Sequence, residues 1–294
     1  GGVPIIRSLK EGLIANKISK IYGIFNGTSN YILSCMDKQN KNFNEVLFNA
    51  KKLGYAESNP TADLNGEDVA SKLKILSSLC FNSFLNNKVY IEGIKHIDKT
   101  DIINANNFGY KIKLLGFAEL LDRKIYQRVH PVLVKKESHV ASVDGVLNAV
   151  IIDGKPVGQS IIQGEGAGAA ATTSALVSDI SSILRGNIKF PFSLSNKERK
   201  QLKFNNIEER FFSAYLRFEV IDKPGVLSNI TKIFSKNKVS IKRLVQNPDK
   251  NKKSSSITII THKSKDKYLS KIIKEVSKKN FIKRRPKLIR IDDN

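Results

Sequence analysis

The sequence predicts an α+β protein of two domains, a mixed-sheet domain followed by a smaller domain of one sheet and two helices. The chain has 294 residues, which is enough for about two domains. Helical and strand patterns are mixed over residues 1–190, whereas residues 211–294 alternate regularly between strand and helix. A polar, charged stretch lies between these regions, and it indicates a linker over residues 191–210.

The composition excludes several classes of protein. Hydrophobic residues make up 40% of the chain and charged residues 26%, which excludes global disorder and a fibrous structure. No apolar run reaches the roughly 18–20 residues of a membrane span and no signal peptide opens the chain, so we expect a cytoplasmic protein without a membrane partner. The two cysteines, Cys35 and Cys80, exclude a disulfide framework.

The formal net charge of +23 could attract a nucleic acid. The lysines are, however, scattered over predicted helix faces and loops. The densest basic runs lack the interleaved aromatic residues that stack against bases. A solvated basic surface explains this pattern, and we expect no nucleic-acid partner.

The first region begins with a helical pattern over residues 5–14 and a strand-like run over 18–25. A turn over 26–30 and a helix that starts at Tyr31 follow. The next helix, over 44–53, is expected to end just before Gly54, because glycine readily adopts the left-handed conformation that terminates helices.

A loop leads from Gly54 into a stronger helix over residues 67–83, whose apolar residues recur at spacings of four, three and four. These apolar residues are Val69, Leu73, Leu76 and Cys80. The remaining expected elements of this region are strands at 125–134, 147–152 and 157–163 and a helix at 170–184.

The second region starts with a half-buried strand, in which Leu216, Phe218 and Val220 alternate with polar residues. The turn Asp222-Lys223-Pro224-Gly225 then precedes a helix. Strands at 239–245 and 255–261, a helix at 265–278 and a strand at 282–291 complete the region. The resulting order, βαββαβ, is that of a ferredoxin-like domain.

The chemistry-bearing segment is residues 54–72, where four carboxylates fall within twelve residues and a lysine follows. Asp68 and Lys72 are four residues apart, so they project from the same face of the predicted helix. Each precedes an apolar residue of the stripe, which places the pair at the edge of the buried face. A lysine in that position could transfer a proton if desolvation lowers its pKa. From spacing alone, an ordinary surface ion pair is the simpler interpretation.

Residues 54–72 closely resemble the signature of homoserine dehydrogenase, and so do residues 24–33, 108–116 and 164–168, in the same order. The turn Asp222–Leu227 and the region around it resemble the ACT regulatory domain. The resemblance implies reduction of L-aspartate 4-semialdehyde to L-homoserine with NADPH or NADH, a step of threonine and methionine biosynthesis.

The resemblance also implies residue roles. Lys72 would donate the proton to the aldehyde oxygen, Glu57 would hold the substrate ammonium, Asp68 would bind the substrate near Lys72, and Asp63 would support the polar cluster. The residues expected to line the substrate and nicotinamide side are Gly27, Thr28 and Tyr55. Thr28 and Gly168 are the residues expected to contact the cofactor, NADP or NAD.

In this family a sodium ion is bound by backbone carbonyls, which the resemblance assigns to Gly1 and Val3. The acidic ligand of that site and the Rossmann domain would precede this chain, so we expect an incomplete sodium site and no activity from the 294 residues alone. An amino-acid effector, usually threonine, and a homo-oligomer are implied as well. The effector would bind at Asp222, Gly225, Val226 and Leu227.

A second class of protein fits part of this pattern: a non-catalytic ACT protein that senses an amino acid. The joint presence of Glu57, Asp68 and Lys72 favours the enzyme, because a sensor has no use for a proton donor.

Overall fold

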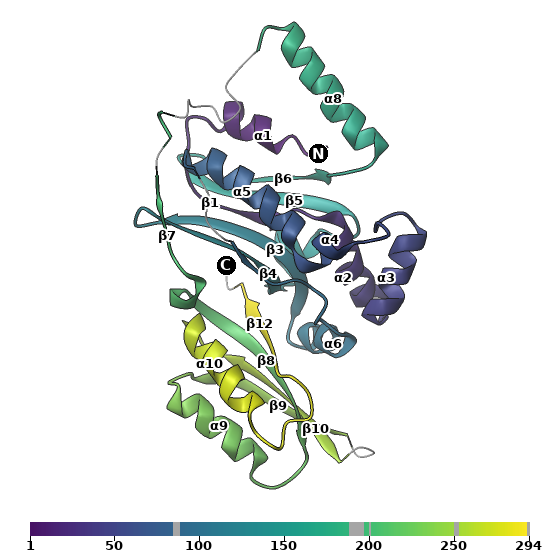
Figure 1. Cartoon of the computed structure of the whole chain (residues 1–294), viewed down its shortest axis with the longest axis vertical. Helices are drawn as coiled ribbons and strands as arrows, with labels where there is room; N and C mark the ends of the chain where they lie inside the picture. The colour runs from purple at the N-terminus through teal and green to yellow at the C-terminus, as the bar shows by residue number, and fades with distance from the viewer. Residues whose placement is uncertain (85–88, 188–196, 200, 250–252, 293–294) are drawn as a thin grey trace. The chain divides into compact units, whose positions relative to one another are not determined.

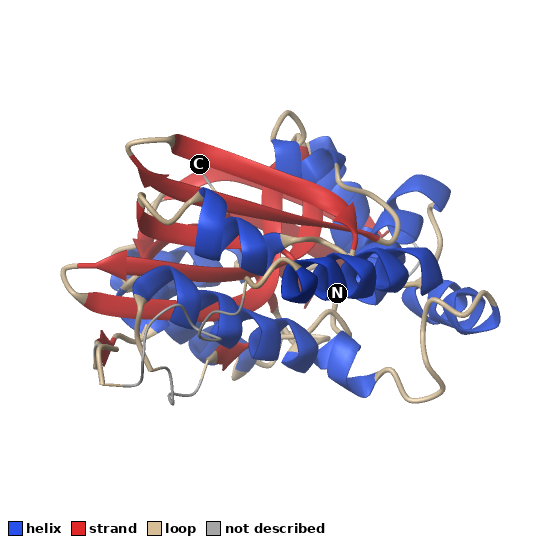
Figure 2. Cartoon of the chain, turned by 90° about the horizontal axis from the view of Figure 1, so that it is seen from above, coloured by secondary structure: helices blue, strands red, loops and turns tan. Residues whose placement is uncertain are grey.

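The computed structural model describes residues 1–84, 89–187, 197–199, 201–249 and 253–292. The chain divides into two compact units, of which the first comprises Gly1–Pro131 with Lys136–Asn205 and the second Val132–Lys135 with Asn206–Asn294. Both units combine strands and helices. Figure 2 shows the chain coloured by secondary structure. The predicted α+β class is confirmed.

The first unit is built on a sheet with the strand order β6-β5-β1-β3-β4. Its strands are β1 (Lys17–Ile24), β3 (Tyr110–Leu121), β4 (Lys124–Lys135), β5 (Leu147–Lys155) and β6 (Gly158–Glu165). The neighbours of β1 and β5 run antiparallel. Two short strands, β2 (Tyr90–Ile91) and β7 (Lys203–Phe204), pair in parallel with β4 and make the sheet mixed, as predicted.

The main helices of the first unit are α2 (Gly27–Gln39), α3 (Phe43–Lys52), α4 (Thr61–Asn65), α5 (Glu67–Phe81), α6 (Lys99–Asn107) and α8 (Ala169–Leu184); α1 (Ile5–Arg7), the π-helical turn Ser8–Gly12 and α7 (His139–Ser142) are short. Of the main helices, α2, α5 and α6 pack on the sheet, and α3 and α4 pack on other helices (Figure 1). α5 packs on β1 and β3, and its stripe residues Val69, Leu73 and Leu76 are buried. Burial of this stripe fixes the face on which Asp68 and Lys72 lie.

The turn predicted over residues 26–30 is wrong, because α2 already begins at Gly27. Asn26 is its N-cap, and the side chain of Asn26 accepts a hydrogen bond from the backbone of Ser29. Asparagine, glycine and serine suit a turn and a helix start equally well, and here the capping hydrogen bond stabilises the helix start.

Three further elements escaped the pattern analysis. β3 is buried on both faces over most of its length, so it lacks the alternation that marks a half-exposed strand. α6 is a nine-residue helix that a capping box between Asp98 and Asp101 starts, and α4 is a single turn of five residues. None of these segments has a long hydrophobic period.

The second unit has the strand order β12-β8-β10-β9, with all neighbours antiparallel. The strands in this order are β8 (Phe211–Ile221), β9 (Ile241–Asp249), β10 (Ser254–Thr261) and β12 (Lys287–Ile291), the short strand β11 (Ser264–Lys265) also pairs with β8, and the helices are α9 (Val226–Lys236) and α10 (Asp266–Ser277). Phe218 of β8 meets Phe234 of α9 edge to face, at 6.3 Å between ring centroids. The predicted βαββαβ order is confirmed.

Part of the predicted linker has regular structure. Residues 191–196 and 200 lie outside the described residues. Within the rest of the 191–210 stretch, Lys203–Phe204 forms β7, and Ile207–Glu209 forms a 3-10 turn. The division between the two units falls after Asn205.

Candidate active site

The buried side chain of Asn26 joins two of the carboxylates in the chemistry-bearing segment. Its Nδ2 donates to Asp63 Oδ1 at 2.7 Å and to Asp68 Oδ2 at 2.8 Å, and its Oδ1 accepts from the backbone N–H of Ser29 at 2.8 Å. Asn26 therefore both caps α2 and holds two carboxylates side by side. The sequence analysis missed this residue. An asparagine directly before a helical run is the signal that could have found it.

Lys72 completes this cluster from the edge of α5. Its Nζ donates to Asp68 Oδ2 at 2.7 Å and to the backbone carbonyl of Phe25 at 3.0 Å. The side chain of Lys72 is 48% exposed and that of Asp68 is 28% exposed, as expected at the edge of the apolar stripe. Two fixed acceptors leave the third N–H of the ammonium group available on the open side.

Thr28 connects the first turn of α2 to the loop after α3. Its Oγ1 donates to the backbone carbonyl of Tyr55 at 2.8 Å. The ring of Tyr55 packs at 4.8 Å between centroids on the ring of Tyr31. Glu57 lies two residues further on; its side chain is exposed and forms no ion pair in the part of the chain that the structure describes. The structure thus joins Thr28 and Tyr55 directly, and it leaves Glu57 open to solvent.

Gly27 lies at a close approach between α2 and the segment before β5. A Cβ at this position would lie 2.8 Å from the carbonyl oxygen of Val146. Any other residue would push α2 away from that segment, so the glycine is required for the position of the helix start.

The turn after β6 contains Gly168, which the resemblance assigns to the cofactor, and it is hydrogen-bonded to Gly2, which lies between the two residues that the resemblance assigns to the sodium ion. The N–H of Gly2 donates to the carbonyl of Gly166 at 3.1 Å, and the carbonyl of Val3 accepts from Ile5 at 2.8 Å. Gly168 is the N-cap of α8 and has a φ of +103°, a conformation that favours glycine. No atom lies within 4 Å of the position that its Cβ would occupy, so this turn has an open surface.

Asn148 connects this turn to the strand that leads into Asn26. Its Nδ2 donates to the carbonyl of Ile24 at 3.1 Å. A Cβ on Gly166 would lie 2.4 Å from Asn148 Oδ1, so that glycine lets the turn pack directly on the amide. The end of β1 and the turn at Gly166–Gly168 are therefore held in one arrangement by a single side chain.

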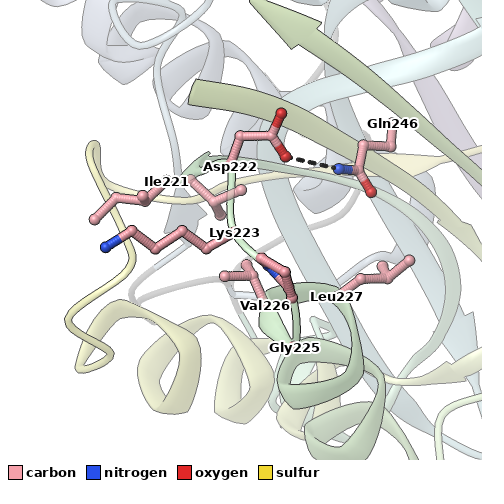
Figure 3. A pocket seen from close by; sticks show the side chains of 9 residues that line it. Ile221, Asp222, Lys223, Gly225, Val226, Leu227 and Gln246 are labelled. Atoms are coloured by element: carbon pink, nitrogen blue, oxygen red, sulfur yellow. Dashed lines mark hydrogen bonds between the residues drawn. The ribbon is translucent and has the colours of Figure 1, made fainter. Parts of the chain in front are cut away.

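The second unit has a pocket of about 450 Å³ at the start of α9. Figure 3 shows the turn from Asp222 to Leu227 on one side and Gln246 of β9 on the other. Gln246 Nε2 lies 3.5 Å from Asp222 Oδ1, and Gly225 takes a φ of +85° as the N-cap of α9. The free N–H groups at this helix start suit a carboxylate.

Among the described residues, no group of three or more His, Cys, Asp or Glu side chains could hold a metal ion. No helix among the described residues is both long and apolar enough to cross a lipid bilayer.

The fold and the site together define a class of protein. A lysine held against a carboxylate at an open edge is suited to acid–base catalysis, and the unit that carries it is followed by a ferredoxin-like unit with a small pocket. These features fit an enzyme domain followed by a domain that can bind a small molecule.

Comparisons with known proteins identify which enzyme family this is. The family model described as homoserine dehydrogenase matches residues 4–181, and the one described as an AHAS small subunit-like ACT domain matches residues 216–281. The chain belongs to the homoserine dehydrogenase family, whose members are NAD(P)-dependent oxidoreductases.

Individual relatives agree with this assignment. The homoserine dehydrogenase of Helicobacter pylori is 39% identical over all of this chain and 69% of its own length. That of Neisseria gonorrhoeae is 38% identical over 99% of this chain and 69% of its length. The crystal structure of a homoserine dehydrogenase from Thiobacillus denitrificans has a TM-score of 0.90 at 36% identity, over all of this chain and 68% of that one.

Proposed function

We propose that this chain carries the substrate site at which a homoserine dehydrogenase reduces L-aspartate 4-semialdehyde to L-homoserine. The observation that supports this most directly is the ammonium of Lys72, which two acceptors fix while nearly half of its side chain remains exposed. The nicotinamide coenzyme, when bound, supplies the hydride. Lys72 donates the proton that the carbonyl oxygen takes up in the reduction, and it accepts that proton in the reverse reaction.

Three carboxylates have separate roles in this proposal. Asp68 orients Lys72 at 2.7 Å and binds the substrate beside it. Asp63 supports the cluster through Asn26, which keeps both carboxylates hydrogen-bonded. Glu57, exposed and without an ion pair in the described residues, holds the ammonium group of the substrate.

Three further residues complete the substrate site in this proposal. Gly27, Thr28 and Tyr55 line the substrate and nicotinamide side; the hydrogen bond from Thr28 to the Tyr55 carbonyl and the close packing of Gly27 on Val146 support this assignment. Thr28 and Gly168 face the coenzyme; the open surface around Gly168 fits that role. A structurally similar archaeal homoserine dehydrogenase, at a TM-score of 0.54 and 27% identity, is described in complex with NADPH.

Further assignments extend the proposal. The backbone carbonyls of Gly1 and Val3 contribute to a sodium site, and the turn at Gly166 that holds Gly2 supports a fixed position for them. The pocket at Asp222, Gly225, Val226 and Leu227 binds an amino-acid effector, which we propose to be threonine. The domain boundaries at residues 1–190, 191–210 and 211–294, a homo-oligomer and a cytoplasmic location complete the proposal.

The test is homoserine oxidation and semialdehyde reduction by the complete gene product that carries this chain, with Lys72→Ala and Lys74→Ala as a matched pair. We expect Lys72→Ala to lower kcat by about 10²–10⁴, the usual contribution of a positioned acid–base group. Lys74 has no contact with Asp68 in the described residues, so Lys74→Ala is expected to keep kcat within about twofold.

Two results would contradict this function. A Lys72→Ala enzyme with unchanged kcat would remove Lys72 from the chemistry. A wild-type protein that binds threonine but turns over neither substrate would instead support the amino-acid sensor.

A further inference from the structure

A second lysine–carboxylate pair lies in the first unit, away from Lys72. The side chain of Lys113, on β3, is only 2% exposed. Its Nζ donates to the carbonyl of Val143 at 2.6 Å, to Asp144 Oδ1 at 2.9 Å and to Asn30 Oδ1 at 3.3 Å. All three N–H groups are used inside the protein, so this ammonium group has none left for a ligand.

Asn30 extends these contacts to the first turn of α2. Its side chain is buried, and its Nδ2 donates to the carbonyls of Val143 at 3.0 Å and Leu147 at 3.1 Å. Lys113 and Asn30 therefore hold both ends of the segment 143–147 from the protein interior.

The same segment touches the backbone that forms the proposed active site. Val146 is the residue on which Gly27 packs, with no room for a Cβ between them. Asn148, which directly follows this segment, donates to the carbonyl of Ile24. The next residue after Ile24 is Phe25, whose carbonyl accepts a hydrogen bond from Lys72. A shift of this segment would displace Gly27 and the end of β1 together.

A buried ion pair is a poor source of stability, because desolvation of the two charges offsets most of their attraction. Burial lowers the pKa of Lys113, and the hydrogen bond to Asp144 opposes that shift. Through its other oxygen, Oδ2, Asp144 also contacts Lys38 at 2.9 Å and Lys111 at 3.5 Å. Well-packed apolar side chains could fill the same space, so the directional hydrogen bonds of Lys113 are the feature that an apolar residue could not replace.

We propose that Lys113, Asn30 and Asp144 form a positioning network that holds the first turn of α2 against the segment 143–148 and thereby sets the positions of Gly27 and Thr28. The three residues act through these neighbours and do not touch the reacting atoms. The proposal rests on the proposed function, which places Gly27 and Thr28 beside the substrate and the nicotinamide.

The kinetic test compares Lys113→Met with Lys111→Met in the complete gene product. Lys111 lies on the same strand and approaches the same carboxylate, but it has no contact with Asn30 in the described residues. We expect Lys113→Met to lower kcat per folded molecule by about tenfold or more and to change KM for homoserine by less than about threefold, because the reacting groups are misaligned rather than lost. The control is expected to stay within about twofold of the wild type.

Asn30→Ala tests the network from its other end, and it also serves if Lys113→Met folds poorly. The two residues share the Val143 carbonyl, so the double variant should be little slower than the slower single variant. A double variant whose loss equals the product of the two single losses would overturn the network.

Hydrogen–deuterium exchange gives a readout that does not need turnover. Residues 26–31 are expected to exchange faster in Lys113→Met and Asn30→Ala than in wild type and Lys111→Met, whereas α10 of the second unit should not change. Unchanged exchange over 26–31 together with unchanged kcat would overturn the positioning role. If the variants exchange faster over residues 26–31 as expected but the wild-type protein does not oxidise homoserine, only the proposed function is overturned.

Discussion

Two lysine–aspartate pairs of the first unit have similar geometry and opposite surroundings. Lys72 lies 2.7 Å from Asp68, and Lys113 lies 2.9 Å from Asp144. The first lysine is 48% exposed, while the second is 2% exposed and has its three hydrogen bonds inside the protein. The distance between the charged atoms therefore does not reveal the role of a pair. The role depends on whether the remaining N–H groups of the lysine are bonded inside the protein or left for a ligand.

The two regions are joined by the first turn of α2. Asn26, at its N-cap, holds the carboxylates beside Lys72, and Asn30, one turn later, accepts from Lys113. The same helix start thus carries one end of the open pair and one end of the buried pair. This comparison predicts that substitution of Lys72 lowers turnover with little effect on stability, whereas substitution of Lys113 lowers both.

The largest stability effect is expected at the buried pair. Lys113→Met should lower the free energy of unfolding by about 3 kcal/mol, at the low end for a broken buried pair because Lys38 and Lys111 still neutralise Asp144. Urea denaturation of the variant and of Lys111→Met measures this difference. Equal stability of the two variants would show that the burial of Lys113 contributes nothing specific.

The next effect is a pH dependence that belongs to the buried pair. Burial acts to raise the pKa of Asp144, but the hydrogen bonds from Lys113 and Lys38 outweigh it and bring the pKa to about 2, below its ordinary value of 3.8. A carboxyl group whose pKa is lowered in the folded state stabilises the fold above its unfolded pKa, and this contribution is lost as the pH falls from about 4 to about 2.

The expected loss over that range is about 2 kcal/mol in the wild type. Asp144→Asn should be less stable at neutral pH and should lack this part of the acid dependence. Chemical denaturation at a series of pH values between about 5 and 2 measures both curves. Parallel curves for the two proteins would contradict the assignment.

A smaller effect is expected at the cap between the two regions. Asn26→Ala removes a helix cap, which should lower the free energy of unfolding by about 1 kcal/mol. The substitution also removes the donor shared by Asp63 and Asp68, so kcat should fall as well. Asn42 is the matched control, because it is the N-cap of α3 without a side-chain capping bond. Thermal unfolding and homoserine turnover of Asn26→Ala and Asn42→Ala distinguish a true cap from a merely polar position.

The smallest stability effect is expected at the open pair. Lys72→Met should change the free energy of unfolding by less than about 0.5 kcal/mol, since an exposed pair four residues apart on a helix contributes little. A loss above about 2 kcal/mol in denaturant unfolding would mean that Lys72 is a structural residue like Lys113, and the comparison would fail.

Much of the fold could be predicted from local patterns. The stripe of α5, the end of α3 before Gly54 and the βαββαβ order of the second unit each depend on residues within one or two turns of each other. β3 could not be recognised in this way, because both of its faces are buried and the alternation disappears.

The candidate site was predicted in the same uneven way. The contact between Asp68 and Lys72 could be predicted from helical spacing. The start of α2 at Gly27 could not, because the residues at its capping bond also favour a turn. Asn26 escaped notice because its partners Asp63 and Asp68 lie 37 and 42 residues further along the chain.

The sequence by itself determined the fold class, the family resemblance and the face on which Lys72 lies, since all of these depend on short-range periodicity and on motifs that can be read in order. Only the tertiary structure decided which lysine is buried. Lys113 and Asn30 are 83 residues apart, and Lys113 and Asp144 are 31 apart. These contacts depend on the closure of long loops and on the packing of β3 against α2. No local sequence pattern encodes either of them.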